Sequence, residues 1–416
     1  MDISKGSVYQ GWIVLAACFF CAMLMIGITF YGYQVFVIPV TQEFGVSRAT
    51  VSYAYIAMLL GVAGWSPFVG RAIDRLPPQY VFSFGALAFA TGFTLLSLSD
   101  DLIHMFLIIL LLVGLGVSSA GGLVANAVVS KWFMKRRGRA LGIASVTSSA
   151  GGFVMVPVVI WLIEAYGWRL TLPILGWGAA LSIILVSLMF IRARPEQHHL
   201  AGFDEFAEAS DMPETVSAAS ESADWTLPKL ARERNFWLLV LGAGLLLASD
   251  QAIMTSKYPF FIDIGLSPVQ AATIISSMTL SAVAGKLIIG YLADYYDVRH
   301  LFAVVAAFHV GLLVMFLWQP GFASLLGFAS LFGAAVGGIY PVWSTLTAKA
   351  FGAPSFGTVF GLMAPFMQVM AIVFVRFIGE VHSVTGTYDV AFWVFLATSA
   401  VASFLIYAMR LPSRTG

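Results

Sequence analysis

Twelve long apolar runs dominate this sequence and limit what the chain can fold into. A helix that spans the hydrocarbon core of a bilayer needs about 20 mostly apolar residues. Because that core offers no water to backbone N–H and C=O groups, such runs are expected as helices. The sequence therefore predicts an all-α integral membrane protein. The predicted spans are 12–40, 52–70, 80–98, 103–130, 140–163, 170–191, 236–262, 268–290, 300–318, 322–348, 357–379 and 388–409.

The composition agrees with this class and excludes several others. Of 416 residues, 60% are hydrophobic and 10% are charged, whereas soluble domains carry about 25% charged residues. The 22 basic and 21 acidic residues nearly balance, and this total says little about partners because it hides where the charges lie. Nothing in the sequence indicates a nucleic-acid partner. Cys18 and Cys21 lie one helical turn apart in an apolar run and are expected to pack there. We predict no metal site and no cofactor.

The basic residues predict the orientation of the chain, because cytoplasmic loops are enriched in Lys and Arg. The N-terminus, every second connection and the C-terminus together hold 17 basic residues, against two, Arg48 and Arg169, in the alternate connections. We therefore expect a cell-membrane protein with both termini in the cytoplasm. The cluster from Lys131 to Arg139 is expected to anchor the topology at the inner surface, facing anionic lipid headgroups.

The chain carries signs of an internal duplication. Gly70-Arg-Ala-Ile-Asp74 recurs as Gly290-Tyr-Leu-Ala-Asp294, displaced by 220 residues, and a Gly-x-x-x-Gly motif at Gly138 recurs 219 residues later. The segment between the halves is polar and acidic, and is predicted as a flexible cytoplasmic linker. The sequence thus predicts two pseudo-symmetric six-helix bundles and a linker. Their predicted bounds are 1–191, 192–234 and 235–416.

Over essentially its whole length the chain resembles the major facilitator superfamily (MFS). GRAIDR and GYLADYYDVR are similar to the loop motif that this superfamily carries once in each half. The resemblance implies an inner gate, in which glycine permits close helix approach and aspartate pairs with basic residues of neighbouring loops. After Arg75 the first copy has Leu76-Pro77-Pro78-Gln79 in place of the motif's glycine and basic residues. This argues against a complete network of charged pairs in that loop. The expected gate residues are Gly70, Asp74, Arg75, Arg137, Gly290 and Asp294.

Within that superfamily the chain resembles the monocarboxylate transporters and the related oxalate:formate antiporters. Three stretches carry this resemblance: KWFMKRRGRALGIASVTSSAGG from Lys131, Gly11-Trp12, and FVIPVTQEFGVSRATVS from Phe36. The small residues of the first stretch, with the basic cluster before them, predict a helix that lets its neighbours cross closely.

Lys286 is the main candidate for binding substrate. It lies eight residues before Asp294, roughly 12 Å along a helix from the inner interface, and therefore near the middle of the membrane. An ionisable group there costs about 2.5–3.5 kcal/mol on insertion scales and needs an anion or a wet cavity. The resemblance implies that Lys286 occupies the place of an arginine that binds the substrate carboxylate. The alternative is a lysine that extends to an interface.

Asp250 is the second deep charge and the candidate for coupling to protons. Burial disfavours its ionised form, as a proton carrier requires. Lys257 lies seven residues later on the same helical face, and a structural ion pair would instead keep Asp250 ionised. The sequence leaves these two roles open.

Further polar and aromatic residues within the spans are candidates for lining the substrate cavity. Packing and interfacial belts are the alternative roles for such residues. The candidates are Tyr31, Tyr33, Gln34, Asn126, Tyr340 and Trp343.

Together these features predict a secondary active transporter of small, lactate-like or pyruvate-like monocarboxylates. We expect a monomer in the lipid bilayer that moves substrate with a proton by alternating access. In the antiporters a second cation binds dicarboxylate, and its place holds Met363 here, which favours a monoanion. An organic-anion exchanger of the oxalate/formate type and a receptor on the same fold are the alternatives. The sequence lacks the motifs of an enzyme site or a P-loop.

Overall fold

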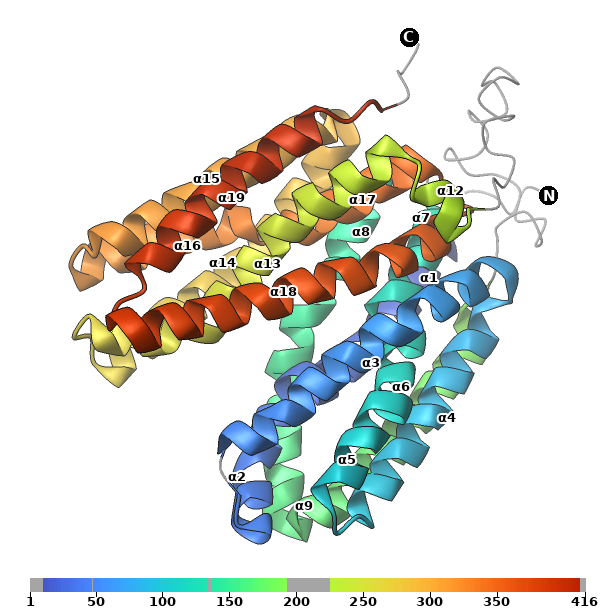
Figure 1. Ribbon diagram of the computed structural model, residues 1–416. Coiled ribbons are helices and arrows are strands. Elements are labelled where there is room, and N and C mark those ends of the chain that lie inside the picture. The colour runs from blue at the N-terminus through green and yellow to red at the C-terminus, as the bar shows by residue number, and fades with distance from the viewer. Residues whose placement is uncertain (1–9, 47, 134–135, 193–224, 412–416) are drawn as a thin grey trace, which may run out of the picture. The chain divides into compact units, whose positions relative to one another are not determined.

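The computed structural model describes residues 10–46, 48–133, 136–192 and 225–411, and within these ranges the chain is helical without strands (Figure 1). Eleven helices in the described residues are long and apolar enough to cross a membrane. The longest, Arg137–Phe190, joins two helices across a kink, because Gly167 has a non-helical backbone (φ 74°, ψ 163°). The predicted all-α membrane fold with twelve spans is thereby confirmed.

The ends of the helices follow local sequence signals. Helix α2 (Tyr33–Phe44) ends at Gly45, whose left-handed backbone (φ 63°) costs glycine little. Helix α14 (Pro268–Tyr295) begins with a capping box, in which the Ser267 side chain accepts from the Gln270 backbone and the Gln270 side chain accepts from the Ser267 backbone. The predicted span ends, taken from the apolar runs and the polar turns between them, fall within a few residues of the observed helix ends.

The described residues divide into two compact units. Unit 1 consists of the described residues within Met1–Ala140, Val146–Trp225 and Phe351–Pro365. Unit 2 consists of those within Leu141–Ser145, Thr226–Ala350 and Phe366–Gly416. Unit 1 therefore includes the first turns of α18 (Phe356–Thr385), and unit 2 includes Leu141–Ser145 of α8 (Arg137–Ser145). Most of the predicted linker, residues 193–224, lies outside the described residues, so the domain bounds stay a prediction.

Unit 1 contains two short π-helical segments, η1 and η2, between its α-helices. Cys18 and Cys21 are fully buried in its first helix, as expected for packing residues. Its other elements are α1 (Gln10–Ile26), η1 (Gly27–Tyr31), α3 (Arg48–Arg75), α4 (Pro78–Ser97), α5 (Leu102–Ile108), η2 (Ile109–Val113), α6 (Gly114–Ala120), α7 (Gly122–Trp132) and α9 (Thr147–Phe190).

Unit 2 has an aromatic core in which Phe260, Phe316 and Phe392 pack within 5.6 Å of one another, measured between ring centroids. Helix α14 packs against α16, and α15 and α13 pack against α19. The other elements of unit 2 are α12 (Leu227–Leu230), α13 (Arg234–Asp263), α15 (Val298–Trp318), α16 (Phe322–Val336), α17 (Ile339–Phe351) and α19 (Asp389–Tyr407).

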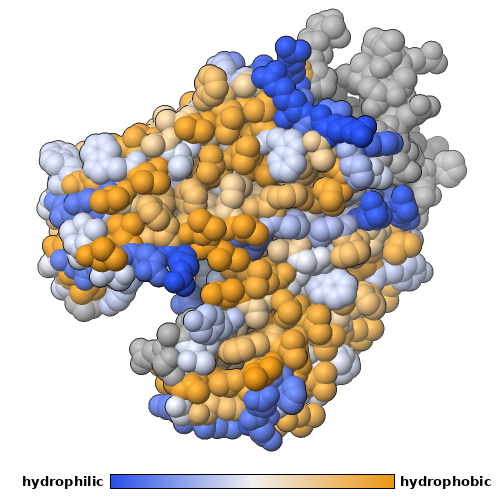
Figure 2. Space-filling view, viewed as in Figure 1, coloured by the Kyte–Doolittle hydropathy of each residue, from blue (hydrophilic) through white to orange (hydrophobic). Residues whose placement is uncertain are grey.

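Large apolar side chains face outward in both units. Phe84 is 61% exposed, Leu280 75% and Phe404 73%. Figure 2 shows apolar side chains over the sides of the helices, while hydrophilic ones gather mainly near helix ends. Water would disfavour so much exposed hydrocarbon, so these surfaces are those of a protein surrounded by lipid.

Candidate functional site

Helix α14 carries Lys286 and crosses α16 at close range. A methyl group added at Gly285 would overlap the carbonyl group of Ala334. One turn away, a methyl group at Gly337 would overlap the carbonyl of Ala282. Small residues at these crossings let the two backbones touch, which fixes the position and rotation of α14 beside Lys286.

A second close approach supports the same part of α14. Residues 141–145 of α8 belong to unit 2, and a methyl group at Gly142 would lie 2.7 Å from the carbonyl oxygen of Lys286. The same methyl group would lie 2.9 Å from the Cα atom of Gly290. The small-residue stretch after the basic cluster therefore packs against the backbone at Lys286, in accord with the predicted close crossing.

Three charged side chains gather inside unit 2. Lys286 on α14 is 7% exposed and Lys257 on α13 is 9% exposed, while Asp250 on α13 is partly buried. Asp250 interacts electrostatically with both lysines. When all three side chains are ionised, the two lysines and the aspartate carry a formal net charge of +1. We call them the charged trio.

The ammonium group of Lys257 has an unexpected neighbour. Its Nζ atom lies 2.8 Å from the Sδ atom of Met254, one turn earlier on α13. A thioether is only a weak acceptor. No ion pair within 4.0 Å joins Asp250 and Lys257 in the described residues. The structure thus brings Asp250 and Lys257 near each other, and both predicted roles of Asp250 stay predictions.

The other predicted residues of unit 2 lie on α17. The rings of Tyr340 and Trp343 are 5.9 Å apart, with Tyr340 41% exposed and Trp343 6% exposed. Trp343 is therefore buried within unit 2, while Tyr340 packs against it and keeps part of its ring at the surface. Their predicted role in lining the cavity stays a prediction.

The predicted cavity residues of unit 1 have different surroundings. The Tyr33 hydroxyl donates to the backbone oxygen of Val51 at 2.8 Å. The ring of Tyr31 lies against Gly152, where an added methyl group would come within 2.7 Å of it. Gln34 on α2 is exposed, and Asn126 on α7 is partly buried. Tyr33 therefore ties α2 to α3, while any role of these four residues toward substrate stays a prediction.

Asp74 of the predicted gate lies at the centre of a polar cluster within unit 1. Its Oδ1 atom is 2.9 Å from Lys131 Nζ, and both side chains are only 10% exposed. Its carboxylate also accepts from the backbone N–H groups of Gly357 and Thr358, at 3.3 and 2.6 Å. These two residues lie at the N-terminus of α18, where free N–H groups favour an anion.

Lys131 corrects one expectation. It was expected to face lipid headgroups as part of the basic cluster, but it is buried against Asp74 and also donates to the Ile73 carbonyl at 3.0 Å. Lys349 repeats this contact in the second half, donating to the Ala293 carbonyl at 3.1 Å. The two lysines are 218 residues apart, close to the repeat offset, so the duplication extends to residues that the motifs did not include.

The remaining gate residues lie near these contacts. A methyl group at Gly70 would overlap the Gly357 carbonyl and lie 3.2 Å from the Cα atom of Gly361. Arg75 ends α3, and Arg137 donates to the Phe133 carbonyl at 3.1 Å. Gly290 and Asp294 lie in the last turns of α14. Their role in gating stays a prediction.

Comparison with known proteins identifies the family of this chain. Residues 15–262 and 239–416 match the family model of the Major Facilitator Superfamily. This chain belongs to the Major Facilitator Superfamily. Monocarboxylate transporter 12 of Rattus norvegicus is 25% identical, over 97% of this chain and 86% of the relative. An MFS-type transporter of Gibberella moniliformis is 27% identical, over 88% and 81%.

Solved structures of MFS transporters share the fold. The proton:xylose symporter XylE bound to 6-bromo-6-deoxy-D-glucose has a TM-score of 0.74 at 13% identity, covering 96% of this chain and 95% of that one. A variant of the Escherichia coli fucose:proton symporter FucP has a TM-score of 0.67 at 16% identity, covering 95% and 98%. The family model, the curated relatives and the apolar helices together make the chain a multi-pass membrane transporter related to the monocarboxylate transporters and not an enzyme. The predicted family is confirmed.

The two copies of the MFS loop motif end differently. In the second copy Arg299 donates to the Asp297 carboxylate at 2.7 Å and to the Met409 carbonyl at 3.0 Å, which ties this loop to the end of α19. The hydrogen bonds from Arg299 hold the pKa of the Asp297 carboxyl below its ordinary value. In the first copy Pro77 and Pro78 start α4 instead. Where the first copy lacks the basic residues of the motif, proline residues therefore begin the next helix.

One buried polar pair of this MFS unit was missed from the sequence. His309 on α15 is fully buried, and its Nε2 atom lies 2.9 Å from the Ser249 hydroxyl on α13. Ser249 directly precedes Asp250. The signal that could have found it is a histidine inside an apolar run, since ionisable residues within spanning helices are rare and often functional.

Proposed function

We propose that this transporter carries small monocarboxylates of the lactate or pyruvate type together with a proton, by alternating access. The charged trio is the observation that supports it. A net charge of +1 inside a membrane unit favours binding of an anion. The relatives named monocarboxylate transporters support the same class of substrate.

Coupling to a proton is supported by Asp250, a carboxyl that lies partly buried on α13 beside the two lysines. If Asp250 takes up a proton while a monocarboxylate binds beside Lys286, the charges added are +1 and −1. The net charge of the site then stays at +1, so the loaded and empty sites carry equal charge within the membrane. A bound anion without the proton would leave the site neutral. In this proposal Lys286 binds the carboxylate and Asp250 carries the proton.

We further propose that the protein works as a monomer in the cell membrane with both termini in the cytoplasm. The distribution of 17 basic residues against two supports this orientation. Asp74, Lys131 and the N-terminus of α18 would then form part of a gate on the cytoplasmic side. Separation of Asp74 from Thr358 would open it, at the cost of a charge-assisted hydrogen bond.

Counterflow in proteoliposomes tests the proposed substrate. We expect labelled lactate and pyruvate to accumulate transiently when the same unlabelled acid is inside, whereas oxalate should not accumulate, because Met363 stands at the place of the second cation that would bind its second carboxylate. Vesicles without protein provide the control. Counterflow of oxalate and formate without lactate would instead identify an organic-anion exchanger and contradict the proposal.

Substitution Asp250→Asn tests the coupling. If Asp250 carries the proton, this change should abolish uphill uptake driven by a pH gradient and leave counterflow measurable, because exchange of bound substrate requires no release of a proton. Uptake and counterflow are measured on the same proteoliposomes. Normal accumulation driven by pH would rule out the proton role. If Asp250 is only the partner of Lys257, Asp250→Asn should lower expression, and adding Lys257→Met should partly restore it.

A further inference from the structure

The buried pair of Ser249 and His309 lies in unit 2, next in sequence to the charged trio, and has no part in the function proposed above. Both side chains are 0% exposed, and the 2.9 Å between the Ser249 hydroxyl and His309 Nε2 is a hydrogen-bond distance. Ser249 lies on α13 and His309 on α15, and α19 packs against both helices. The pair therefore joins two helices of the unit by one directional contact.

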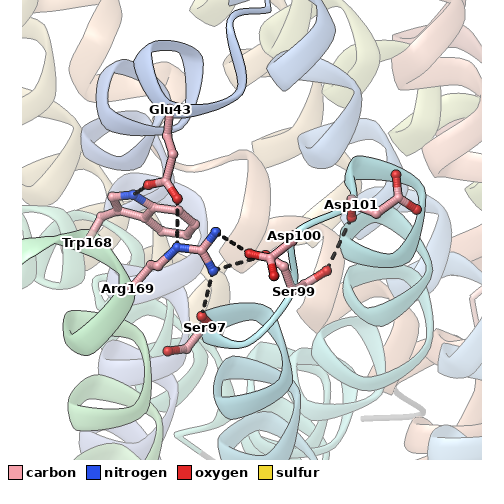
Figure 3. Close-up of polar contacts among 7 residues, drawn as sticks. All are labelled: Glu43, Ser97, Ser99, Asp100, Asp101, Trp168 and Arg169. Atoms are coloured by element: carbon pink, nitrogen blue, oxygen red, sulfur yellow. Dashed lines mark hydrogen bonds and ion pairs between the residues drawn. The ribbon is translucent and has the colours of Figure 1, made fainter.

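His309 differs from the polar residues that hold helix ends together. In a cluster of unit 1 (Figure 3), Arg169 donates to four oxygen atoms, those of the Glu43 and Asp100 carboxylates and of the Ser97 and Ser99 carbonyls. The Nδ1 atom of His309 is instead buried, and it has no hydrogen-bond partner in the part of the chain that the structure describes. A buried nitrogen without a partner costs free energy. Stability therefore does not explain a histidine at this place, whereas its contact with Ser249 does.

Ser249 lies on the face of α13 that packs against α19. Gly242 lies seven residues earlier, on the same face, and a methyl group added there would be 2.8 Å from the Ile406 side chain of α19. Successive residues of a helix are turned by about 100°. Asp250 is therefore turned away from this face, and it interacts electrostatically with Lys286 of α14. The rotation of α13 that buries Ser249 is thus the one that brings Asp250 to the trio.

The hydrogen bond of Ser249 defines this rotation more sharply than the apolar side chains beside it. The preceding turn is Gly244-Leu-Leu-Leu-Ala248, and similar aliphatic side chains pack about equally well after a small rotation. A single buried polar residue, in contrast, can fix the register of packed helices. Hydrogen bonds between membrane helices add little stability. The contact with His309 is therefore better suited to orienting α13 than to holding the fold together.

We infer that His309 is a positioning residue, which acts through Ser249 to hold the carboxyl group of Asp250 beside Lys286. Both His309 and Ser249 are fully buried, so neither touches the substrate. Their effect falls on the step in which Asp250 gives up or takes up its proton, because this step depends on the place of the carboxyl group. The inference rests on the proton role proposed above for Asp250.

Substitution Ser249→Ala tests this inference in proteoliposomes with labelled lactate. We expect uptake driven by a pH gradient to fall about tenfold, as loss of an orienting partner does at metal sites. Counterflow should stay near the wild-type rate, because exchange of bound substrate requires no release of a proton. Ser399→Ala is the matched control. Ser399 is an equally buried hydroxyl of unit 2, but it donates to the Phe395 carbonyl of its own helix, so both transport rates should stay unchanged.

Two changes at His309 separate positioning from other roles. His309→Gln keeps an amide group that can reach Ser249 and should retain most of the uptake driven by pH. Adding His309→Leu to Ser249→Ala removes both polar partners, which is nearly neutral for stability. This double variant should be as stable as wild type and still lose the coupled uptake. It also provides the test if Ser249→Ala alone does not fold.

The outcomes distinguish this inference from the proposed function. Wild-type protein without uptake driven by pH would overturn the proposed function and the inference with it. Normal coupled uptake by Ser249→Ala or by the double variant, with wild type coupled, would overturn the inference alone. Equal loss of counterflow and coupled uptake would also overturn it, since the pair would then serve the whole site. Loss of coupling in His309→Gln but not in Ser249→Ala would show that His309 itself carries a proton.

Discussion

Removing the charge of Lys286 should abolish saturable uptake of monocarboxylates without unfolding the transporter. Truncating one partner of a buried charge pair typically costs about 2–5 kcal/mol in binding, so Lys286→Met should weaken substrate affinity about thirtyfold or more. The empty protein should stay as stable as wild type or become more stable, because a buried ammonium group that is costly to desolvate is removed. Uptake and thermal stability, with and without lactate, are the measurements.

Two variants provide the controls for this result. Lys286→Arg keeps the charge and should retain some uptake with altered selectivity, because a planar guanidinium binds a carboxylate differently from an ammonium group. Lys257→Met lowers the charge of the trio by the same amount but leaves Lys286 in place, so it should weaken binding less than Lys286→Met does. A Lys286→Met protein that loses stability but binds substrate normally would show that Lys286 is structural and that the carboxylate binds elsewhere.

The second large effect is expected at Gly285, where one methyl group should destabilise unit 2. In Gly285→Ala the new Cβ atom would overlap the carbonyl of Ala334, and backbone cannot move aside as a flexible side chain does. Overpacking commonly costs about 1–3 kcal/mol, and a clash between two helix backbones should reach the upper part of that range or exceed it. Thermal stability in detergent, together with the monodisperse fraction, measures the loss.

Gly327→Ala is the matched control for Gly285→Ala. Gly327 lies on α16, the partner helix of α14, but it is exposed and has no atom within 4 Å of an added methyl group. Alanine also favours a helix over glycine by about 0.8–1.0 kcal/mol, so this variant should be neutral or more stable. Equal stability of the two variants would contradict the close crossing of α14 and α16.

The spans and the family could be predicted because their signals are local in sequence. A run of about 20 apolar residues predicts a span by itself. The break at Gly167 was also foreseen, since the prediction separated 140–163 from 170–191 although the helices run on as Arg137–Phe190. The repeat offset was visible because glycine and aspartate recur at close to the same spacing in both halves.

The contacts of individual side chains could not be predicted, because they depend on how helices rotate against each other. Lys131 was assigned to lipid headgroups by its place in a basic cluster, yet the approach of α7 to α3 buries it against Asp74. For Asp250 the sequence left open a proton role and a pair with Lys257, because a seven-residue spacing places the two on one face without fixing their contacts; in the structure the Lys257 ammonium group lies 2.8 Å from Met254 Sδ. Spacing along one helix defines a face, but the partners of that face come from other segments.

The charge count of the trio has a consequence for how the membrane potential acts on the proposed carrier. A charge that crosses the membrane field exchanges about 2.3 kcal/mol with every 100 mV. One proton moving with one monocarboxylate carries no net charge across the membrane, so the voltage would do no net work on a complete cycle. The gradients of pH and of the acid itself would then set the direction of transport. A carrier built this way works equally well in polarised and depolarised cells.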